Sequence, residues 1–269
     1  MGKERGHKRQ RQLDMTVAAI QRQYGPWALV KGDRSRVSGS TAVPHIPTGF
    51  PALDRALGIG GLPRGRVCEL VGPATSGKTT LGLKFLAQAQ ASGAAKDRVG
   101  YVDQALYFDP DYAHRCGLDL SRLLIGRPQD VKEALAMTEA LARSGGLAAL
   151  AFDILDFTWT DPAAASLLAA TFDRLTTTLA RSGTVLMVLH ESPAGDAGHS
   201  PPGGSPALSA VAHVAAVRLG VVRERWLYQG RDVRGYQARV EVLKNRLGPA
   251  GQTVSLDIEF NGTVHGNGL

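Results

Sequence analysis

The chain has 269 residues, and 43% of them are hydrophobic, which is enough to bury the core of an α/β domain. No apolar run approaches the roughly 18 residues of a membrane-spanning helix, and no apolar signal segment follows the basic N-terminus, so we expect neither a membrane protein nor a secreted one. The net charge of +7 favours a polyanionic partner such as nucleic acid. Cys68 and Cys116 are the only cysteines and lack metal-ligand spacing, which indicates a reducing, cytoplasmic environment.

The first predicted element in chain order is an N-terminal amphipathic helix. Apolar residues recur at helical spacing from Leu13 to Tyr24, and Gly25-Pro26 ends the pattern. Residues 27–30 are typical of a short strand, and residues 34–46 are polar enough to form a linker. We therefore expect a helix and arm over residues 1–33, a linker over 34–46 and one core domain over 47–269.

From Ile46 onward, short apolar runs alternate with helical patterns. This alternation predicts an α/β fold with a mainly parallel sheet and helices on both faces. The expected strands cover residues 67–71, 99–102, 147–152 and 185–189, and the expected helices cover residues 79–91, 132–143 and 163–181. After Ala215 the pattern becomes β-rich, at residues 217–222, 238–243 and 254–258, which predicts an antiparallel extension at the C-terminal side. Residues 192–206 are rich in Pro, Gly and Ser and are typical of a mobile loop.

A phosphate-binding motif lies between the first of these strands and the first of these helices. The motif G-x-x-x-x-G-K-[ST] is matched by Gly72, Pro73, Ala74, Thr75, Ser76, Gly77, Lys78 and Thr79. In this context the backbone N–H groups and the helix N-terminus bind phosphate. Lys78 is expected to reach the β- and γ-phosphates of ATP, and the Thr79 hydroxyl to bind Mg²⁺.

An acidic residue that helps to hold the magnesium ion is expected at the end of a neighbouring buried strand. Asp153 ends the strand predicted over residues 147–152 and fits this position, with Asp156 as the nearby alternative. Asp103 ends another strand and is a further candidate near the γ-phosphate. A helix or turn cap is the structural alternative for Asp153.

Beyond the P-loop, several segments resemble bacterial RecA in order and spacing from about Leu13 to Thr263. They are Ile46-Pro-Thr-Gly-Phe-Pro-Ala-Leu-Asp54, Gly60-Gly-Leu-Pro-Arg-Gly65, Asp109-Pro-Asp-Tyr112 with Gly117, Ala140-Leu-Ala-Arg-Ser-Gly145, and Arg239-Val-Glu-Val-Leu-Lys-Asn-Arg246. The resemblance implies a RecA-type ATP-binding core and a role in DNA repair or recombination. The chain ends where RecA would begin its separate C-terminal domain, so we expect that domain to be absent.

The resemblance also implies roles for individual residues. Asp109 and Tyr112 match the residues that hold and stack on adenine, and Thr80 follows the metal-binding threonine as in the family. Lys244 and Arg246 match basic residues that reach the nucleotide of the next subunit, where they supply positive charge in trans. The N-terminal helix and the strand after it resemble the arm by which one protomer binds its neighbour, which implies self-association.

Three departures from the family bear on activity. Ala105 occupies the position of the glutamate that activates the attacking water, and its loss should slow hydrolysis by roughly 10²–10⁴-fold. His190-Glu191 replaces the segment with the glutamine that senses the γ-phosphate. The segment that corresponds to the second DNA-binding loop, residues 192 to about 212, has no Lys or Arg, which weakens any contact with single-stranded DNA there. A plain disordered connection is the alternative for that loop.

The short C-terminus and residues 117–135 resemble a second group, the ImuA-type accessory proteins of bacterial translesion synthesis. Two main hypotheses follow. The first is a RecA-like ATP-binding protein that associates with single-stranded DNA and hydrolyses ATP slowly, as a weak DNA-dependent ATPase. The second is a non-hydrolysing accessory protein that recruits a DNA polymerase or RecA. A hexameric motor of the same superfamily is a third, which the N-terminal arm and the Lys244-Asn-Arg246 segment disfavour.

Overall fold

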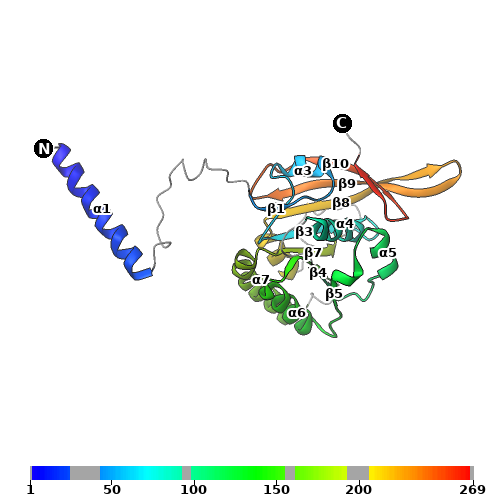
Figure 1. Ribbon diagram of the computed structural model, residues 1–269, viewed down its shortest axis with the longest axis horizontal. Coiled ribbons are helices and arrows are strands. Elements are labelled where there is room, and N and C mark those ends of the chain that lie inside the picture. The colour runs from blue at the N-terminus through cyan, green and yellow to red at the C-terminus, as the bar shows by residue number, and fades with distance from the viewer. Residues whose placement is uncertain (1, 25–42, 93–97, 155–160, 193–205, 267–269) are drawn as a thin grey trace. The chain divides into compact units, whose positions relative to one another are not determined.

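The computed structural model describes residues 2–24, 43–92, 98–154, 161–192 and 206–266 (Figure 1). It divides into two units, residues 1–42 and residues 43–269. The first unit contains helix α1 (Gly2–Tyr24), so the helix expected from Leu13 is confirmed but begins earlier. Residues 3–12 are mostly Lys, Arg, Gln and Glu, which are good helix formers without any apolar periodicity. The strand expected at residues 27–30 and most of the expected linker lie outside the described residues, and the division into 1–33, 34–46 and 47–269 stays a prediction.

The second unit is built on a nine-stranded sheet of order β11-β10-β9-β8-β3-β7-β6-β4-β5. The strands from β8 to β5 run parallel, which confirms the predicted, mainly parallel sheet. Strand β5 was not predicted, and β8, which was expected in the antiparallel extension, pairs in parallel with β3. They are β8 (Val217–Gln229), β3 (Val67–Gly72), β7 (Val185–Glu191), β6 (Leu147–Asp153), β4 (Arg98–Asp103) and β5 (Leu123–Gly126). The predicted antiparallel extension is also confirmed and consists of β9 (Asp232–Asn245), β10 (Thr253–Glu259) and β11 (Val264–Gly266). A separate small sheet pairs β1 (His45–Ile46) with β2 (Leu62–Pro63).

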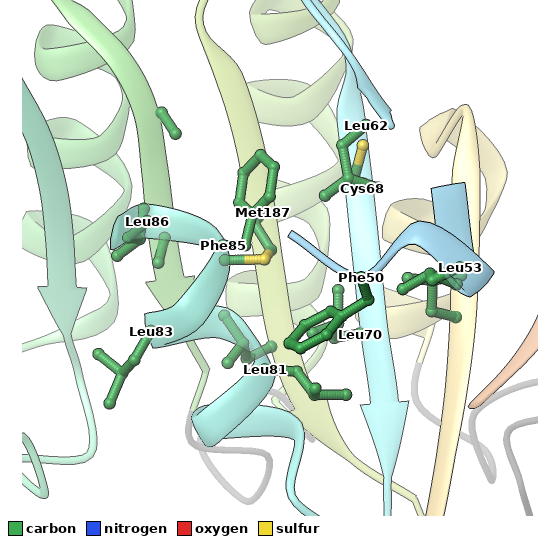
Figure 2. Close-up of a cluster of buried hydrophobic side chains, with 14 of the residues drawn as sticks. Phe50, Leu53, Leu62, Cys68, Leu70, Leu81, Leu83, Phe85, Leu86 and Met187 are labelled. Carbon is green, nitrogen blue, oxygen red and sulfur yellow. The ribbon is translucent and has the colours of Figure 1, made fainter. Parts of the chain in front are cut away.

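Helices cover both faces of the sheet, as expected. On one face, Leu81 and Phe85 of α4 (Lys78–Ala91) pack against Leu70 and Met187 in a cluster that Phe50 also joins (Figure 2). Helix α3 (Pro51–Leu57) contributes to the same cluster. The other face carries α6 (Val131–Ser144), α7 (Pro162–Ser182) and α8 (Pro206–Val214). None of the helices that the structure describes is long and apolar enough to cross a bilayer.

Helices α6 and α7 begin and end where their sequences supply caps. Asp130 accepts the Glu133 N–H at 2.7 Å and caps α6, while Asp161 accepts the Ala164 N–H at 2.9 Å and caps α7 just before Pro162. Each helix ends at a glycine in the left-handed conformation, Gly145 at φ 66° and Gly183 at φ 72°. Local sequence signals therefore define where α6 and α7, two of the three helices on this face, begin and end.

The structure differs from the sequence-based expectation in two places near the C-terminal half. Strand β8 continues past residue 222 to Gln229 and forms with β9 a long hairpin that projects from the rest of the sheet (Figure 1). Charged and aromatic residues alternate irregularly there, so hydrophobic periodicity did not predict it. Helix α8 occupies residues 206–214 and takes up the end of the segment that corresponds to the second DNA-binding loop, residues 192 to about 212, because Leu208 and Val211 are buried in the core. The rest of that loop, residues 193–205, lies outside the described residues.

Candidate nucleotide-binding site

The P-loop connects β3 to α4 at the carboxyl edge of the parallel sheet, where the sequence placed it. Two of its glycines are required by close packing. A Cβ added at Gly72 would lie 2.1 Å from the Val221 carbonyl oxygen, and one at Gly77 would lie 2.9 Å from the Tyr236 hydroxyl oxygen. Gly77 also has φ 102°, a conformation that favours glycine. The loop is therefore held tightly against strands β8 and β9.

The side chains of the loop fit a phosphate ligand. The Ser76 hydroxyl is buried and has no hydrogen-bond partner among the described residues, which is unusual for a buried polar group. The Lys78 ammonium lies 3.3 Å from the Pro73 carbonyl oxygen and 3.5 Å from Glu191 Oε1, at the amino end of α4. Thr79 is exposed at the same helix end, so its hydroxyl is accessible. A buried donor that lacks a partner, a buried lysine and a helix N-terminus together suit an anion.

Asp153 lies at the carboxyl edge, opposite Asp103 in the register of β6 and β4. It accepts a hydrogen bond from the Tyr101 hydroxyl at 2.5 Å. Burial raises the pKa of Asp153 to about 6, with help from the charges of Asp103 and Glu191 and against the effects of Tyr101 and Lys78. Such a carboxylate gains a great deal from a bound cation, because the cation compensates the charge that burial disfavours.

No group of three or more His, Cys, Asp or Glu side chains forms a ready metal cage among the residues that the structure describes. Mg²⁺ in a nucleotide site does not need such a cage, because the ion is usually held by one or two protein oxygens together with phosphates and water. Thr79 and Asp153 are the residues that would hold it. Asp156, the alternative to Asp153, lies outside the described residues.

Asp103 has a structural role, and the role suggested for it near the γ-phosphate stays a prediction. Its buried carboxylate accepts the backbone N–H groups of Tyr107 and Phe108, each at 3.1 Å, and Arg127 Nε lies 3.9 Å away. Asp103 therefore anchors the turn that follows β4. Ala105 lies in this turn, which carries no other carboxylate up to Phe108.

Of the two residues expected around adenine, Tyr112 lies on α5 (Pro110–Arg115) and Asp109 directly precedes this helix, while Thr80 lies on α4. The Tyr112 and Thr80 hydroxyl oxygens are 2.8 Å apart, and burial raises the pKa of Tyr112 to about 12. The Asp109 carboxylate accepts the Tyr112 N–H at 3.0 Å and caps α5. Thr80 and Tyr112 thus contact each other, which the sequence did not predict, while Asp109 has a structural role that also fixes the position of Tyr112.

Lys244 and Arg246 lie at the other end of the sheet. Lys244 lies near the end of β9, and Arg246 follows that end. This part of β9 pairs with the beginning of β8, which lies beside the amino end of β3 rather than beside the P-loop. Lys244 donates to the carbonyl oxygens of Ala212 and His213, at 2.6 and 2.9 Å, and Arg246 donates to that of His213. The chain does not bring this pair to its own nucleotide site, so any contact with nucleotide would involve a second subunit.

Sequence reasoning missed a buried charged cluster behind the P-loop. The carboxylate of Glu69 on β3 lies 2.5 Å from His190 Nε2 and also binds the Arg218 guanidinium. Burial acts to raise the pKa of Glu69, but the hydrogen bonds and charges of His190 and Arg218 outweigh it and hold the pKa below its usual value. His190 therefore faces Glu69, and the next residue, Glu191, faces Lys78. Glu69 is the only acidic residue in the apolar strand β3, and this was the signal in the sequence that could have identified the cluster.

A second missed feature is Arg223, which lies beside the P-loop. Its Nη1 donates to the Thr75 hydroxyl at 3.1 Å, and its guanidinium lies 4.2 Å from the centre of the Trp226 ring. Trp226 packs in turn against two other rings. Its ring centre lies 6.1 Å from that of Tyr236 and 6.4 Å from that of Phe260. The sequence did not indicate this position of Arg223, because the pairing of β8 with β3 that brings it to the loop is not encoded in a local pattern.

A P-loop at the end of a central parallel strand, with acidic residues ending the next strands, defines a P-loop domain of the RecA-like α/β class. The profile of the RecA N-terminal domain family matches residues 11–265, and the chain belongs to this family.

The relatives agree with this assignment. The chain is 35% identical to the RecA of Frankia casuarinae over 98% of its length and 78% of that protein. It is 35% identical to the RecA of Rubrobacter xylanophilus over 92% of its length and 74% of that protein. The crystal structure of the RadB recombinase shares the fold, with a TM-score of 0.63 and 21% identity over 83% of this chain and all 100% of the other. The resemblance to RecA is therefore confirmed, whereas the resemblance to ImuA-type proteins stays a prediction.

Proposed function

We propose that the protein binds ATP and Mg²⁺ at the P-loop and acts in DNA repair or recombination as a RecA-like protein. The buried Ser76 hydroxyl, which has no partner among the described residues, is the observation that carries the proposal of nucleotide binding. Residues 72–79 would hold the phosphates of ATP, and Thr79 and Asp153 would hold the metal ion. Thr80, Asp109 and Tyr112 would lie on the side of the site that holds the adenine base. When bound, the ion would neutralise charge on the phosphates.

Association with single-stranded DNA is the second part of the proposal. Membership of the RecA family and the net charge of +7 support it. The distal part of the β8–β9 hairpin exposes Arg225, Arg231 and Arg234 together with Tyr228, which is 63% exposed. Arginines and exposed aromatic rings suit single strands, because the arginines attract the phosphates and the bases stack on the rings. We place the protein in the cytoplasm, where this role would be carried out.

Self-association is the third part. Leu13, which lies on the apolar side of α1, is 56% exposed, so this side of the helix is available to a neighbouring protomer. In such an assembly Lys244 and Arg246 would act on the nucleotide of the next subunit. Hydrolysis would be slow, because Ala105 provides no base and the carboxylate of Asp103, nearby in the same turn, is occupied by backbone N–H groups.

The alternative is a non-hydrolysing accessory protein that binds ATP as a structural ligand and recruits a DNA polymerase or RecA. Ala105 is the observation that favours it. The two functions differ in one measurable property, which is whether DNA stimulates turnover of ATP.

The test is ATP binding and ATP hydrolysis, each with and without single-stranded DNA, in the wild type and in Lys78→Ala. The matched control is Lys132→Ala, an exposed lysine of α6 that should change neither property. DNA-stimulated turnover that is lost only in Lys78→Ala supports the first function. ATP binding without turnover, whether or not DNA is present, supports the accessory function. Absence of ATP binding in the wild type would refute both.

A further inference from the structure

Arg223 is a cation that lies next to the phosphate-binding loop but outside the P-loop motif. Strand β8 pairs in parallel with β3 up to Val71↔Gly220, so residue 223 lies beyond the carboxyl end of β3, where the P-loop begins. Arg223 donates to the hydroxyl of Thr75, a non-glycine residue with φ 59°. This conformation is uncommon for threonine and holds that residue at the exposed side of the loop.

The side chain of Arg223 is oriented by stacking. In a regular strand, residues three apart face opposite sides, but the register of β8 shifts between Arg223 and Arg225. The shift allows the Arg223 guanidinium to lie over the Trp226 ring, with 4.2 Å to its centre. Trp226 is itself fixed by Tyr236 and Phe260. A planar guanidinium held on an aromatic face is pre-organised to donate from its free edge.

The charge of Arg223 is not neutralised by a carboxylate among the described residues. The nearest acidic neighbour in sequence, Glu224, instead forms an ion pair with Arg239, with 3.0 Å between Oε1 and Nε. Lys78, the other cation of the loop, already lies 3.5 Å from Glu191. Arg223 is therefore the cation at the loop that has a neutral hydroxyl as its hydrogen-bond partner, and a phosphate would be a stronger acceptor for it.

We propose that Arg223 is a second phosphate-binding cation of this site, supplied in cis by β8, which contacts the terminal phosphate of bound ATP while Trp226 positions it. This inference rests on the proposed binding of ATP. It assigns the γ-phosphate because the backbone N–H groups at the amino end of α4 serve the inner phosphates, whereas Thr75 lies on the loop away from that helix end. Arg223 would then share the γ-phosphate with Lys78. The same contact links the nucleotide to the root of the projecting hairpin.

The experiment uses calorimetry to compare the affinities of ATP and ADP for the wild type and for Arg223→Ala, Arg223→Lys and Arg181→Ala. Arg223→Ala should weaken ATP binding about tenfold or more and ADP binding much less, because only ATP carries the phosphate that Arg223 contacts. Arg223→Lys keeps the charge but loses the planar stack, so its ATP affinity should be intermediate. Arg181→Ala, which changes an exposed arginine in the last turn of α7, should leave both affinities unchanged.

A second readout does not depend on affinity. Binding of ATP should change the fluorescence of Trp226 as its stacked guanidinium moves to the phosphate, and the signal should be lost in Trp226→Phe and in Arg223→Ala. Equal affinities of wild type and Arg223→Ala for ATP would overturn the inference while leaving ATP binding in place. A variant that weakens ATP and ADP equally, or weakens only DNA binding, would overturn it as well. A wild type that binds neither nucleotide would instead refute the proposed function itself.

Discussion

Glu69→Gln tests how the strands around the nucleotide site are held together. Glu69 is fully buried, His190 is 1% exposed, and the side chain of Arg218 is 13% exposed. Glutamine has nearly the same volume, so the change removes a charge without leaving a cavity. It leaves the Arg218 guanidinium desolvated without its counter-charge, and breaking a buried pair in this way costs about 3–5 kcal/mol. Because Arg218 retains some exposure, we expect a loss of about 3 kcal/mol in the free energy of unfolding at neutral pH.

The effect should depend on pH in a defined direction. The pKa of Glu69 lies below its usual 4.5 in the folded protein because the contributions of His190 and Arg218 outweigh the effect of burial. A carboxyl group with a lowered pKa stabilises the fold above the pKa of the unfolded state. That stabilisation is lost as the pH falls through the lowered value. The difference between wild type and Glu69→Gln should therefore shrink as the pH falls below 4.5.

Urea denaturation at about pH 7 and about pH 4 measures this difference. The matched control is Glu224→Gln, which removes a carboxylate that is 36% exposed and paired with Arg239. The control should cost less than about 1 kcal/mol, because exposed ion pairs contribute little. The reasoning is refuted if Glu69→Gln costs no more than the control, or if its cost stays the same at both pH values.

Three further changes test other parts of the structure. Glu191→Gln removes a half-exposed carboxylate that holds Lys78 and repels phosphate, so ATP should bind about 2- to 5-fold more tightly by calorimetry, and weaker binding would contradict this. Ala105→Glu restores a carboxylate to the turn after β4 and should raise the rate of ATP hydrolysis by about 10²-fold or more, whereas an unchanged rate in a steady-state assay would show that the turn directs this position away from the γ-phosphate. Asp161→Ala removes the cap of α7 and should lower the free energy of unfolding by about 1 kcal/mol, while Asp161→Asn, which keeps a side-chain acceptor, should change it little.

The sequence predicted those parts of the fold that follow from local patterns. The P-loop, the helices α4, α6 and α7, and the parallel strands have buried apolar residues at regular spacing, and the site residues Lys78 and Asp153 follow directly from two of these elements. Pairings between distant strands could not be predicted in this way. The contacts of Glu69 with Arg218 and of Arg223 with Thr75 exist because β8 lies beside β3, and no local pattern encodes that neighbourhood. The distal hairpin was missed for a related reason, since its strands are stabilised mainly by pairing with each other.

Asp103 shows a different limit. A carboxylate at the end of a buried strand is expected at a nucleotide site, and the sequence does not say whether its oxygens are free. In the structure the backbone of residues 107 and 108 occupies both oxygens, so the residue shapes the turn that carries Ala105. Residue type and strand position predict which groups reach an edge of the sheet. The hydrogen bonds that those groups already make decide which of their atoms remain available for a ligand.

The same reasoning applies to Lys244 and Arg246, whose role in trans depends on whether they have donors left. Lys244 uses two of its three N–H groups on the carbonyls of Ala212 and His213, and Arg246 shares the second of these carbonyls, so both side chains retain donors. Burial lowers the pKa of Lys244, and the neighbouring charges of Arg246 and Arg218 lower it further. Two cations that repel each other at the end of α8 favour the approach of an anion, because a phosphate would relieve the repulsion. Such an anion would reach this pair only from a second subunit, and it would contact the side chains that hold α8 at the end of the second loop.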